Sequence, residues 1–208
     1  MFRHSGSRTR RLVAFLERRE KAPPGRRGAL DRQLSPSLFR PRAVVYTDTA
    51  DFTDRTLRDG ILHFLMVFNR AARKAQGVVA SAGGRVVKVE ADSLMLLFPD
   101  VPTAFAGVDG LEALLRRLNR RRPSDERLSF SYGIGFGDVL DLEGDVFGLE
   151  VNLASKLGED LARPGEALLT PAAAATLDAR SLRRVVPYEV VTFGRVAIPV
   201  QRLKLKRR

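Results

Sequence analysis

The clearest hydrophobic pattern in the chain is a pair of short β-rich runs on either side of a polar bend. Arg85–Val89 precedes the bend Glu90–Ser93, and the almost unbroken apolar run Leu94–Phe98 follows it. This spacing predicts a β-hairpin. The apolar second run predicts a strand inside a sheet that is covered on both faces. The bend would hold Lys88 and Asp92 close together, so it is a candidate position for a functional site.

Before the hairpin, the pattern predicts a helix, a linker, a strand and a second helix. In chain order these are Thr9–Glu20 with Ser7 or Thr9 as its cap, the linker Gly25–Pro41 after a Pro-Pro-Gly stop, the strand Arg42–Thr47, and a helix that opens at Phe52. Thr53 is the expected cap of this second helix. This second helix is predicted to be amphipathic, because its apolar residues fall on one face: Leu57, Ile61, Phe64, Leu65 and Phe68. The stretch Gly77–Phe98 is expected to supply a short strand and then the hairpin.

After the hairpin, helical and strand patterns continue to alternate. We expect a helix at Thr103–Arg122, a Gly-rich strand at Leu128–Val139 that needs close backbone approach, an acidic loop at Asp138–Asp145, a helix at Phe147–Leu161, a strand at Ala167–Thr170, a short helix at Pro171–Leu177, and an antiparallel pair at Val185–Thr192 and Ala197–Leu205. The order β-α-β-β-α-β with trailing strands predicts an α/β (α+β) sandwich of ferredoxin-like topology.

Length and charge divide the chain into parts. The 208 residues carry a net charge of +12, of which residues 1–40 hold +8 and residues 201–208 hold +5, so the centre is close to neutral. We therefore expect a basic N-terminal arm over 1–40, one domain over 41–205, and a basic tail over 206–208. Basic arms of this kind are usually solvated, and contact with nucleic acid or an acidic membrane is the less favoured alternative.

Cysteine content and hydropathy restrict the class of protein. The absence of cysteine excludes a disulfide framework and thiolate metal sites. The apolar run Leu12–Leu16 is too short for a secretory signal, and no run approaches the ~18 residues of a membrane helix. We therefore expect a soluble, cytoplasmic protein.

Two carboxylates at predicted strand ends are the main candidates for chemistry. Asp48 follows one strand and Asp92 lies on the hairpin bend, so the two meet if these strands are neighbours. With a backbone carbonyl such as that of Thr49, they would form an oxygen-rich site suited to Mg²⁺ or Mn²⁺. Taken alone, each aspartate is more typical of a turn or a cap than of a metal site. The tight turn at Asp51–Asp54 adds backbone N–H groups that can hold phosphate.

Four segments together resemble a known family. They are Tyr46–Thr53, Gly83–Asp92, Asp145–Lys156 and Arg163–Glu166. In this order they resemble the catalytic domain of class III nucleotidyl (adenylate/guanylate) cyclases, over about residues 42–205. The resemblance implies a nucleotide cyclase fold and the conversion of ATP to 3′,5′-cyclic AMP and pyrophosphate.

The resemblance also implies roles for individual residues. Asp48, Asp92 and the carbonyl of Thr49 would hold two Mg²⁺ or Mn²⁺ ions, with Lys88 and Asp145 reading the base, Asn152 orienting the ribose, Lys156 at the position of the transition-state arginine, and Phe52, Thr53 and Arg195 near the phosphates. In the family the metal carboxylates of one chain meet the base-reading residues of a second, so a homodimer would contain two complete sites.

The base-reading pair can also be argued from chemistry. Lysine only donates hydrogen bonds and ionised aspartate only accepts them, so Lys88 and Asp145 match the ring-nitrogen acceptor and the amino donor of adenine. Guanine reverses both groups. Cytosine shows the same pattern as adenine, which leaves a pyrimidine cyclase open.

Several residues depart from the family pattern and favour a second hypothesis. Asp51 and Ala91 replace glycines, Lys156 replaces the arginine that would bind phosphate in a bidentate manner, and Phe193 replaces a lysine. The alternative is a weak or inactive cyclase-like module that binds nucleotide and regulates a partner.

Three other features are given structural explanations. The Gly-rich run Gly133–Gly137 lies within a strand rather than before a helix, so it is not read as a dinucleotide loop. His4 and His63 are too isolated for a metal site. A basic cluster comprising Arg116, Arg117, Arg120, Arg121 and Arg122 is interpreted as a solvated helix end, because no aromatic residues interleave with it.

Overall fold

One mixed sheet organises the molecule. The computed structural model describes residues 6–142 and 144–206, without the side chains of 34–37. Within these residues the eight-stranded sheet has the order β2-β3-β1-β4-β6-β8-β7, and β5 pairs with β4. The strands are β1 Phe39–Thr49, β2 Arg85–Glu90, β3 Ser93–Phe98, β4 Phe130–Leu142, β5 Asp145–Phe147, β6 Ala167–Leu169, β7 Val185–Phe193 and β8 Val196–Leu203.

The connectivity confirms the predicted fold class. The first four strands lie in the order β2-β3-β1-β4, and β1 is antiparallel to both β3 and β4. One helical connection follows β1 and another follows β3, which is the ferredoxin-like βαββαβ arrangement. The predicted hairpin is β2–β3, and all six residues of β3 are buried, as expected for a strand covered on both faces.

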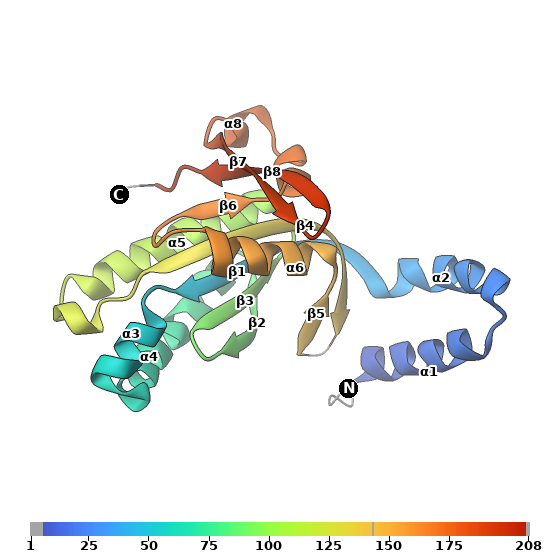
Figure 1. Cartoon of the computed structure of the whole chain (residues 1–208), viewed down its shortest axis with the longest axis horizontal. Coiled ribbons are helices and arrows are strands. Elements are labelled where there is room, and N and C mark those ends of the chain that lie inside the picture. The colour runs from blue at the N-terminus through green and yellow to red at the C-terminus, as the bar shows by residue number, and fades with distance from the viewer. Residues whose placement is uncertain (1–5, 143, 207–208) are drawn as a thin grey trace.

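Helices cover both faces of the sheet (Figure 1). The helices α4 Ile61–Ser81 and α5 Val101–Asn119 lie against one face, after the short helix α3 Phe52–Asp59. The opposite face carries α6 Leu149–Lys156 and the π-helix η2 Leu157–Leu161. Three short helices complete the chain: η1 Ser124–Glu126, α7 Pro171–Ala175 and α8 Ala179–Leu182. No helix within the described ranges has both the length and the apolar character needed to cross a bilayer.

The core is thicker on the α4/α5 face. Alternate residues of β1 divide between the two faces, as strand geometry requires. Ala43 and Val45 pack with α4 and α5, whereas Val44 and Tyr46 pack with α6 and the underside of the hairpin. Asp48, two residues after Tyr46, therefore belongs to the thinner α6 face.

The Gly-rich strand β4 allows α6 to lie very close to the sheet. A Cβ atom on Gly133 would meet the backbone oxygen of Ala154 at 1.9 Å and the backbone nitrogen of Gly158 at 2.6 Å. A Cβ on Gly135 would meet the backbone oxygen of Glu150 at 2.6 Å. The expected close backbone approach is therefore confirmed, and its partner is the helix that follows β5.

The N-terminal region differs from the prediction. Helix α1 spans Ser7–Lys21 with Gly6 as N-cap, so neither Ser7 nor Thr9 caps it. The predicted linker over Gly25–Pro41 is wrong, because α2 occupies Pro24–Leu38 and β1 begins at Phe39. Proline is well accommodated at the first position of a helix, so Pro24 begins α2 rather than excluding it.

Helices α1 and α2 lie side by side in an arm that leads into β1 (Figure 1). Arg19 contacts both carboxylate oxygens of Asp31, at 2.7 and 3.1 Å, and so links α1 to α2. Leu12 packs with Leu38, Leu140 and Leu142 at the far end of β4. Arm residues 1–5, including His4, and tail residues 207–208 lie outside the described residues. Whether the basic arm binds a polyanion stays a prediction.

The helix predicted to open at Phe52 is divided in two by Gly60. This residue has a φ of 86°, which ends α3, and α4 begins at Ile61. Thr53 does not cap α3, since the N-cap is Asp51 without a side-chain hydrogen bond. The break also overturns the predicted stripe: Phe64 and Phe68 are buried, but Leu57 is 80% exposed and Ile61 and Leu65 are partly exposed.

The bounds of two other predicted elements also differ from the structure. Helix α4 continues to Ser81, so the short strand expected after Gly77 is absent and Val79 instead packs in the core. Most of the predicted acidic loop belongs to β4 and β5, which form a hairpin around residues 143–144; residue 143 lies outside the described residues.

Candidate active site

The structure brings the two predicted metal carboxylates together. Strand β1 pairs with β3 so that Thr47 lies opposite Leu94, which places Asp48 beside the bend that carries Asp92. Two hydroxyl contacts hold this junction: Thr47 Oγ1 accepts from the Leu94 N–H at 3.0 Å, and Thr49 Oγ1 donates to the Asp92 carbonyl at 2.6 Å. The bend is therefore tied to the end of β1 on both sides of Asp48.

The two carboxyl groups disturb each other's ionisation. Burial, followed by repulsion from Asp92 and Glu159, raises the pKa of Asp48 to about 7. Burial also raises the pKa of Asp92. Two close carboxylates in a partly buried site cannot both ionise without cost, so the raised pKa values favour retention of a proton on the pair.

The donor set suits a hard divalent cation. A cation would replace the proton on the pair, and carboxylate oxygens are the ligands that Mg²⁺ and Mn²⁺ prefer. No group of three or more His, Cys, Asp or Glu residues forms a metal cluster in ranges 6–142 and 144–206. The aspartate pair would therefore leave several coordination positions to substrate oxygens and water, as is usual for Mg²⁺ bound with a phosphate substrate.

The predicted base-reading residues also meet, but a third residue joins them. The Lys88 ammonium lies 3.8 Å from an Asp145 oxygen and 2.7 Å from an oxygen of Glu90. The hydroxyl of Tyr46 donates to the other oxygen of Glu90 at 2.7 Å. The hydrogen bond from Lys88 lowers the pKa of Glu90, and the same contact raises the pKa of Lys88. Glu90 is thus the principal partner of Lys88 in the single chain.

Sequence reasoning missed Tyr46 and Glu90 as parts of this site. Tyr46 lies two residues before Asp48 and Glu90 lies two residues after Lys88. Because side chains alternate along a strand, each of these residues faces the same side as its predicted neighbour. Period-two spacing from the chosen residues was therefore the signal that could have found them.

The remaining predicted site residues lie apart from these two clusters. Asn152 and Lys156 are exposed on α6, and Lys156 pairs with Asp160 at 3.1 Å. Arg195 is exposed in the turn between β7 and β8. No side-chain hydrogen bond or ion pair joins these three to Asp48 or Lys88 in the described part of the chain. They stay predictions for a site shared with another chain.

The positions of Phe52 and Thr53 restrict what they can contribute. The Phe52 ring packs edge-on against Phe64, with centroids 4.8 Å apart, so its side chain belongs to the core. Only the backbone N–H groups at the start of α3 are then available to a phosphate. Thr53 is exposed there.

Three of the departures from the family pattern have structural consequences. Asp51 and Ala91 both adopt positive φ, 63° and 37°, in a region that glycine occupies without strain. Phe193 is partly buried and packs against the cluster of Leu157, Leu168 and Val200. It therefore contributes to the packing of the β7–β8 hairpin instead of offering a charge.

Neutralising Asp48 is expected to stabilise the metal-free protein at pH 8. The folded-state pKa of about 7 lies above the ordinary value of 3.8, so the free energy of unfolding falls as pH rises between these values. Asp48→Asn removes this loss. Because the side chain is half exposed, we expect a gain of about 1–2 kcal/mol rather than the full ~4. Thermal denaturation in EDTA at pH 4 and pH 8 measures it.

The same thermal denaturation also tests whether Asp48 binds a divalent cation. Mn²⁺ should raise the melting temperature of the wild type at pH 8 and have little effect on Asp48→Asn. Asp138→Asn, an exposed neutralisation on β4, is the matched control. Equal stabilisation by Asp138→Asn, or an Asp48→Asn gain that persists at pH 4, would contradict the argument.

Adenylate cyclases are among the proteins that this chain resembles in sequence. No protein-family model matches the chain. An adenylate cyclase from Glutamicibacter nicotianae is 31% identical over 142 residues, which is 67% of this chain and 33% of that protein. The chain spans only 21–35% of the length of the curated relatives that it matches.

Solved structures show the same fold. The adenylate/guanylate cyclase/hydrolase from Silicibacter pomeroyi superposes with a TM-score of 0.66 at 22% identity and covers 81% of this chain and 98% of that one. A bacterial light-regulated adenylyl cyclase gives 0.68 at 15% identity and covers 97% of this chain and 66% of that one. The chain therefore has the fold of adenylate and guanylate cyclases, with sequence similarity to bacterial adenylate cyclases over about two thirds of its length.

Proposed function

We propose that this chain is a class III nucleotide cyclase domain that converts ATP to 3′,5′-cyclic AMP and pyrophosphate as a homodimer. One observation supports this most directly: the fold joins the Asp48–Asp92 pair and the Lys88–Asp145 pair on one face of the sheet. The first pair suits divalent cations and the second suits adenine, so the two halves of ATP have matching chemistry.

The chain's own residues have distinct tasks in this proposal. Asp48 and Asp92 hold the cations and give up the proton retained on the pair when these bind. Two bound divalent cations would favour loss of the ribose 3′-hydroxyl proton and neutralise the triphosphate. The backbone N–H groups at the start of α3 add phosphate contacts, and Asn152 orients the ribose.

Adenine recognition requires Lys88 to donate to the base in addition to Glu90. In the single chain its ammonium is closer to Glu90 than to Asp145. Lysine has three donors, so Lys88 can keep Glu90 while it donates to the ring nitrogen of adenine. Glu90, held by Tyr46, would then position Lys88 for the base.

Reversing the charge at Lys88 should change base preference. Lys88→Glu removes the donor to adenine and supplies an acceptor, so we expect kcat/KM for ATP to fall about 10- to 100-fold. Combined with Asp145→Lys, it should raise the ratio of GTP to ATP turnover. Initial rates with both nucleotides measure this ratio. Lys74→Glu, an exposed lysine on α4, is the control, and an unchanged ratio in the double variant would contradict the assignment.

Exposed apolar side chains beside the site support the homodimer. Val89 on β2, Phe147 on β5 and Leu149 at the start of α6 are 48, 41 and 70% exposed. Phe147 and Leu149 follow Asp145 in the chain and lie beside the base-reading cluster, where the family arrangement brings a second chain against the first. Val89 points to the opposite face of β2 from Lys88. A second copy would bury this apolar surface and bring its own Asn152 and Lys156 to the metal carboxylates.

A regulatory module without turnover is the second proposal. Lys156 is exposed and paired with Asp160, and Phe193 is packed into an apolar cluster, so neither is aimed at a phosphate in the single chain. Asp51 adds a negative charge where phosphate would bind.

One assay separates the two proposals. The purified chain is incubated with Mn²⁺ and each of the four ribonucleoside triphosphates, and cyclic products are identified by mass spectrometry. A cyclic product supports the enzyme and identifies its base. Saturable nucleotide binding without product supports the module.

A further inference from the structure

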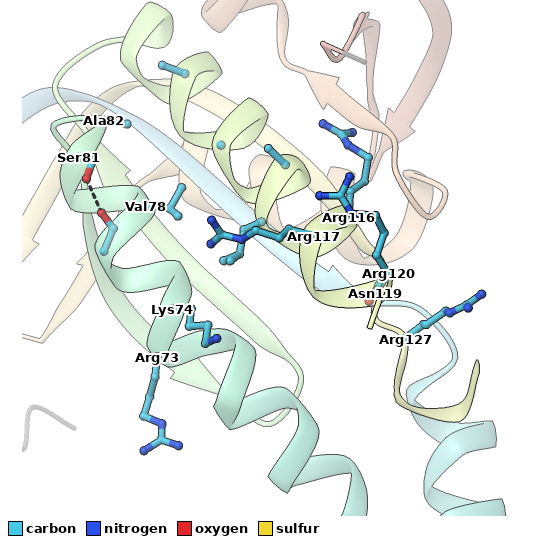
Figure 2. A pocket seen from close by; sticks show the side chains of 15 residues that line it. Arg73, Lys74, Val78, Ser81, Ala82, Arg116, Arg117, Asn119, Arg120 and Arg127 are labelled. Atoms are coloured by element: carbon cyan, nitrogen blue, oxygen red, sulfur yellow. Dashed lines mark hydrogen bonds between the residues drawn. The ribbon is translucent and has the colours of Figure 1, made fainter. Parts of the chain in front are cut away.

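A basic groove lies between α4 and α5, away from the candidate active site. Its volume is about 1640 Å³. The α4 wall is made by Arg73, Lys74, Gly77, Val78, Ser81 and Ala82, and the α5 wall includes Ala106, Gly110, Ala113, Arg116, Arg117 and Arg120 (Figure 2). Both helices cover the face of the sheet opposite α6, so this groove and the Asp48 site lie on different sides.

The charge of the groove is of one sign. Six of its lining residues are basic and none is acidic: Arg73, Lys74, Arg116, Arg117, Arg120 and Arg127. Five of them, Arg73, Lys74, Arg117, Arg120 and Arg127, form no ion pair with any other described residue. Three members of the basic cluster interpreted from sequence as a solvated helix end, Arg116, Arg117 and Arg120, thus share one groove with cations from a second helix.

The basic residues gather at one end (Figure 2). Figure 2 shows Arg73 and Lys74 toward one end of the α4 wall, with Val78, Ser81 and Ala82 toward the other. The hydroxyl of Ser81 donates to the Gly77 carbonyl at 2.8 Å and so uses its donor within α4. The second end therefore offers mostly small and apolar surface.

The floor and the size of the groove favour a macromolecular segment. Small residues at Gly77, Ala106 and Ala113 leave room for a backbone to approach closely, whereas Gly110 lies against Val78 and lets α4 and α5 pack together. The volume exceeds the ~300–1,000 Å³ typical of small-molecule pockets. The fifteen residues from Ala106 on α5 to its C-cap Arg120 extend about 21 Å, which matches four turns of a docked helix.

The lining also argues against single-stranded nucleic acid as the ligand. No aromatic side chain lines the groove, and single-stranded nucleic acid is held mainly by stacking on aromatic rings. An apolar floor beside unpaired cations complements a helix with a small apolar stripe and carboxylates along its edges.

We propose that the α4/α5 groove docks an acidic amphipathic helix of a partner protein. The apolar stripe of that helix lies on the Gly/Ala floor, and its carboxylates pair with Lys74, Arg117 and Arg120. This docking is independent of the proposed cyclase activity, because it uses neither the metal carboxylates nor the base-reading residues.

A peptide-binding experiment on the full chain tests the proposal. The probe is a fluorescent 20-residue helix with blocked ends, an Ala/Leu stripe and glutamates on both edges. Its scrambled isomer keeps the charge but loses the stripe. Anisotropy at 0.15 M salt, without nucleotide, should show saturable binding of the helix and about tenfold weaker binding of the isomer.

Three variants locate the binding site. Arg117→Glu with Arg120→Glu should weaken the helix about tenfold or more, because attraction becomes repulsion. Arg180→Glu with Arg183→Glu, which reverses two exposed cations on and after α8, should leave affinity unchanged. Ala113→Trp fills the floor and should weaken the helix while retaining any binding of a 20-base-pair DNA duplex. Circular dichroism checks that each variant is folded.

Two sets of results would contradict the docking proposal. Equal affinity for the helix and its scrambled isomer, or equal effects of the two double reversals, would reduce the groove to a nonspecific cationic surface. Binding of the duplex but not of the helix, with a steep salt dependence, would identify a nucleic-acid surface instead. Either outcome overturns the proposal and leaves the cyclase assay unaffected.

Discussion

Replacing Asp92 by asparagine is expected to reduce cyclic nucleotide formation about 100-fold or more, corresponding to at least ~2.7 kcal/mol of transition-state stabilisation. Asparagine has the same shape, and the Thr49 contact to the Asp92 carbonyl does not involve the side chain, so the bend keeps its structure. The variant loses only the charge that would hold the cations. Initial rates with Mn²⁺ and ATP measure the loss, and Asp138→Asn is the matched neutralisation.

A mixing experiment separates a lost charge from a lost fold. If sites form between chains, Asn152→Ala should also be inactive, because it removes a residue from the other half of the site. An equal mixture of Asp92→Asn and Asn152→Ala chains would then regain about a quarter of wild-type activity, since half of the dimers contain one intact site. An inactive mixture, with mixed dimers demonstrated, would mean that each site lies within one chain.

Placing an alanine at Gly133 is expected to destabilise the fold by about 3 kcal/mol or more. The new Cβ would lie 1.9 Å from the Ala154 carbonyl oxygen and 2.6 Å from the Gly158 nitrogen, both of them backbone atoms. Relief requires α6 and η2 to move away from β4. Urea denaturation followed by circular dichroism measures the change in the free energy of unfolding.

A second glycine variant is the control for Gly133→Ala. Gly77 is exposed on α4, and a Cβ there meets no atom within 4 Å. Gly77→Ala should therefore be neutral or stabilise the chain by up to about 1 kcal/mol, because alanine favours the helix. If Gly133→Ala were as stable as Gly77→Ala, α6 would not pack against the sheet as described.

The sheet was predictable because its signals are local. Period-two alternation and an apolar run identify β2 and β3 without knowledge of their neighbours, and the order of elements then favours one topology. The helix breaks were harder. Gly60 interrupts a pattern that stays helical on both sides, and the Pro-Pro-Gly sequence before α2 ended a helix and also began the next one.

The candidate site was predictable only in part, for a physical reason. Asp48 and Asp92 meet because two strands pair, and that pairing was inferable. The choice of Glu90 as the nearer partner of Lys88 depends on side-chain geometry, which the spacing alone leaves open. The relation of Lys74 to Arg117 depends on how two helices pack, so the basic residues of α5 could be interpreted from sequence only as a helix end.

The place of β2 at the rim of the sheet separates two kinds of evolutionary change. Lys88 lies on this outermost strand, just beyond a shift in its pairing with β3, whereas Asp48 lies on β1 between two neighbours. A mutation on β2 disturbs hydrogen bonding to one neighbouring strand, β3, and little of the core. A mutation on β1 disturbs hydrogen bonding to two neighbouring strands, β3 and β4. If Lys88 and Asp48 have the proposed roles, base recognition can change in descendants of this sequence while the aspartates proposed to bind the cations are retained.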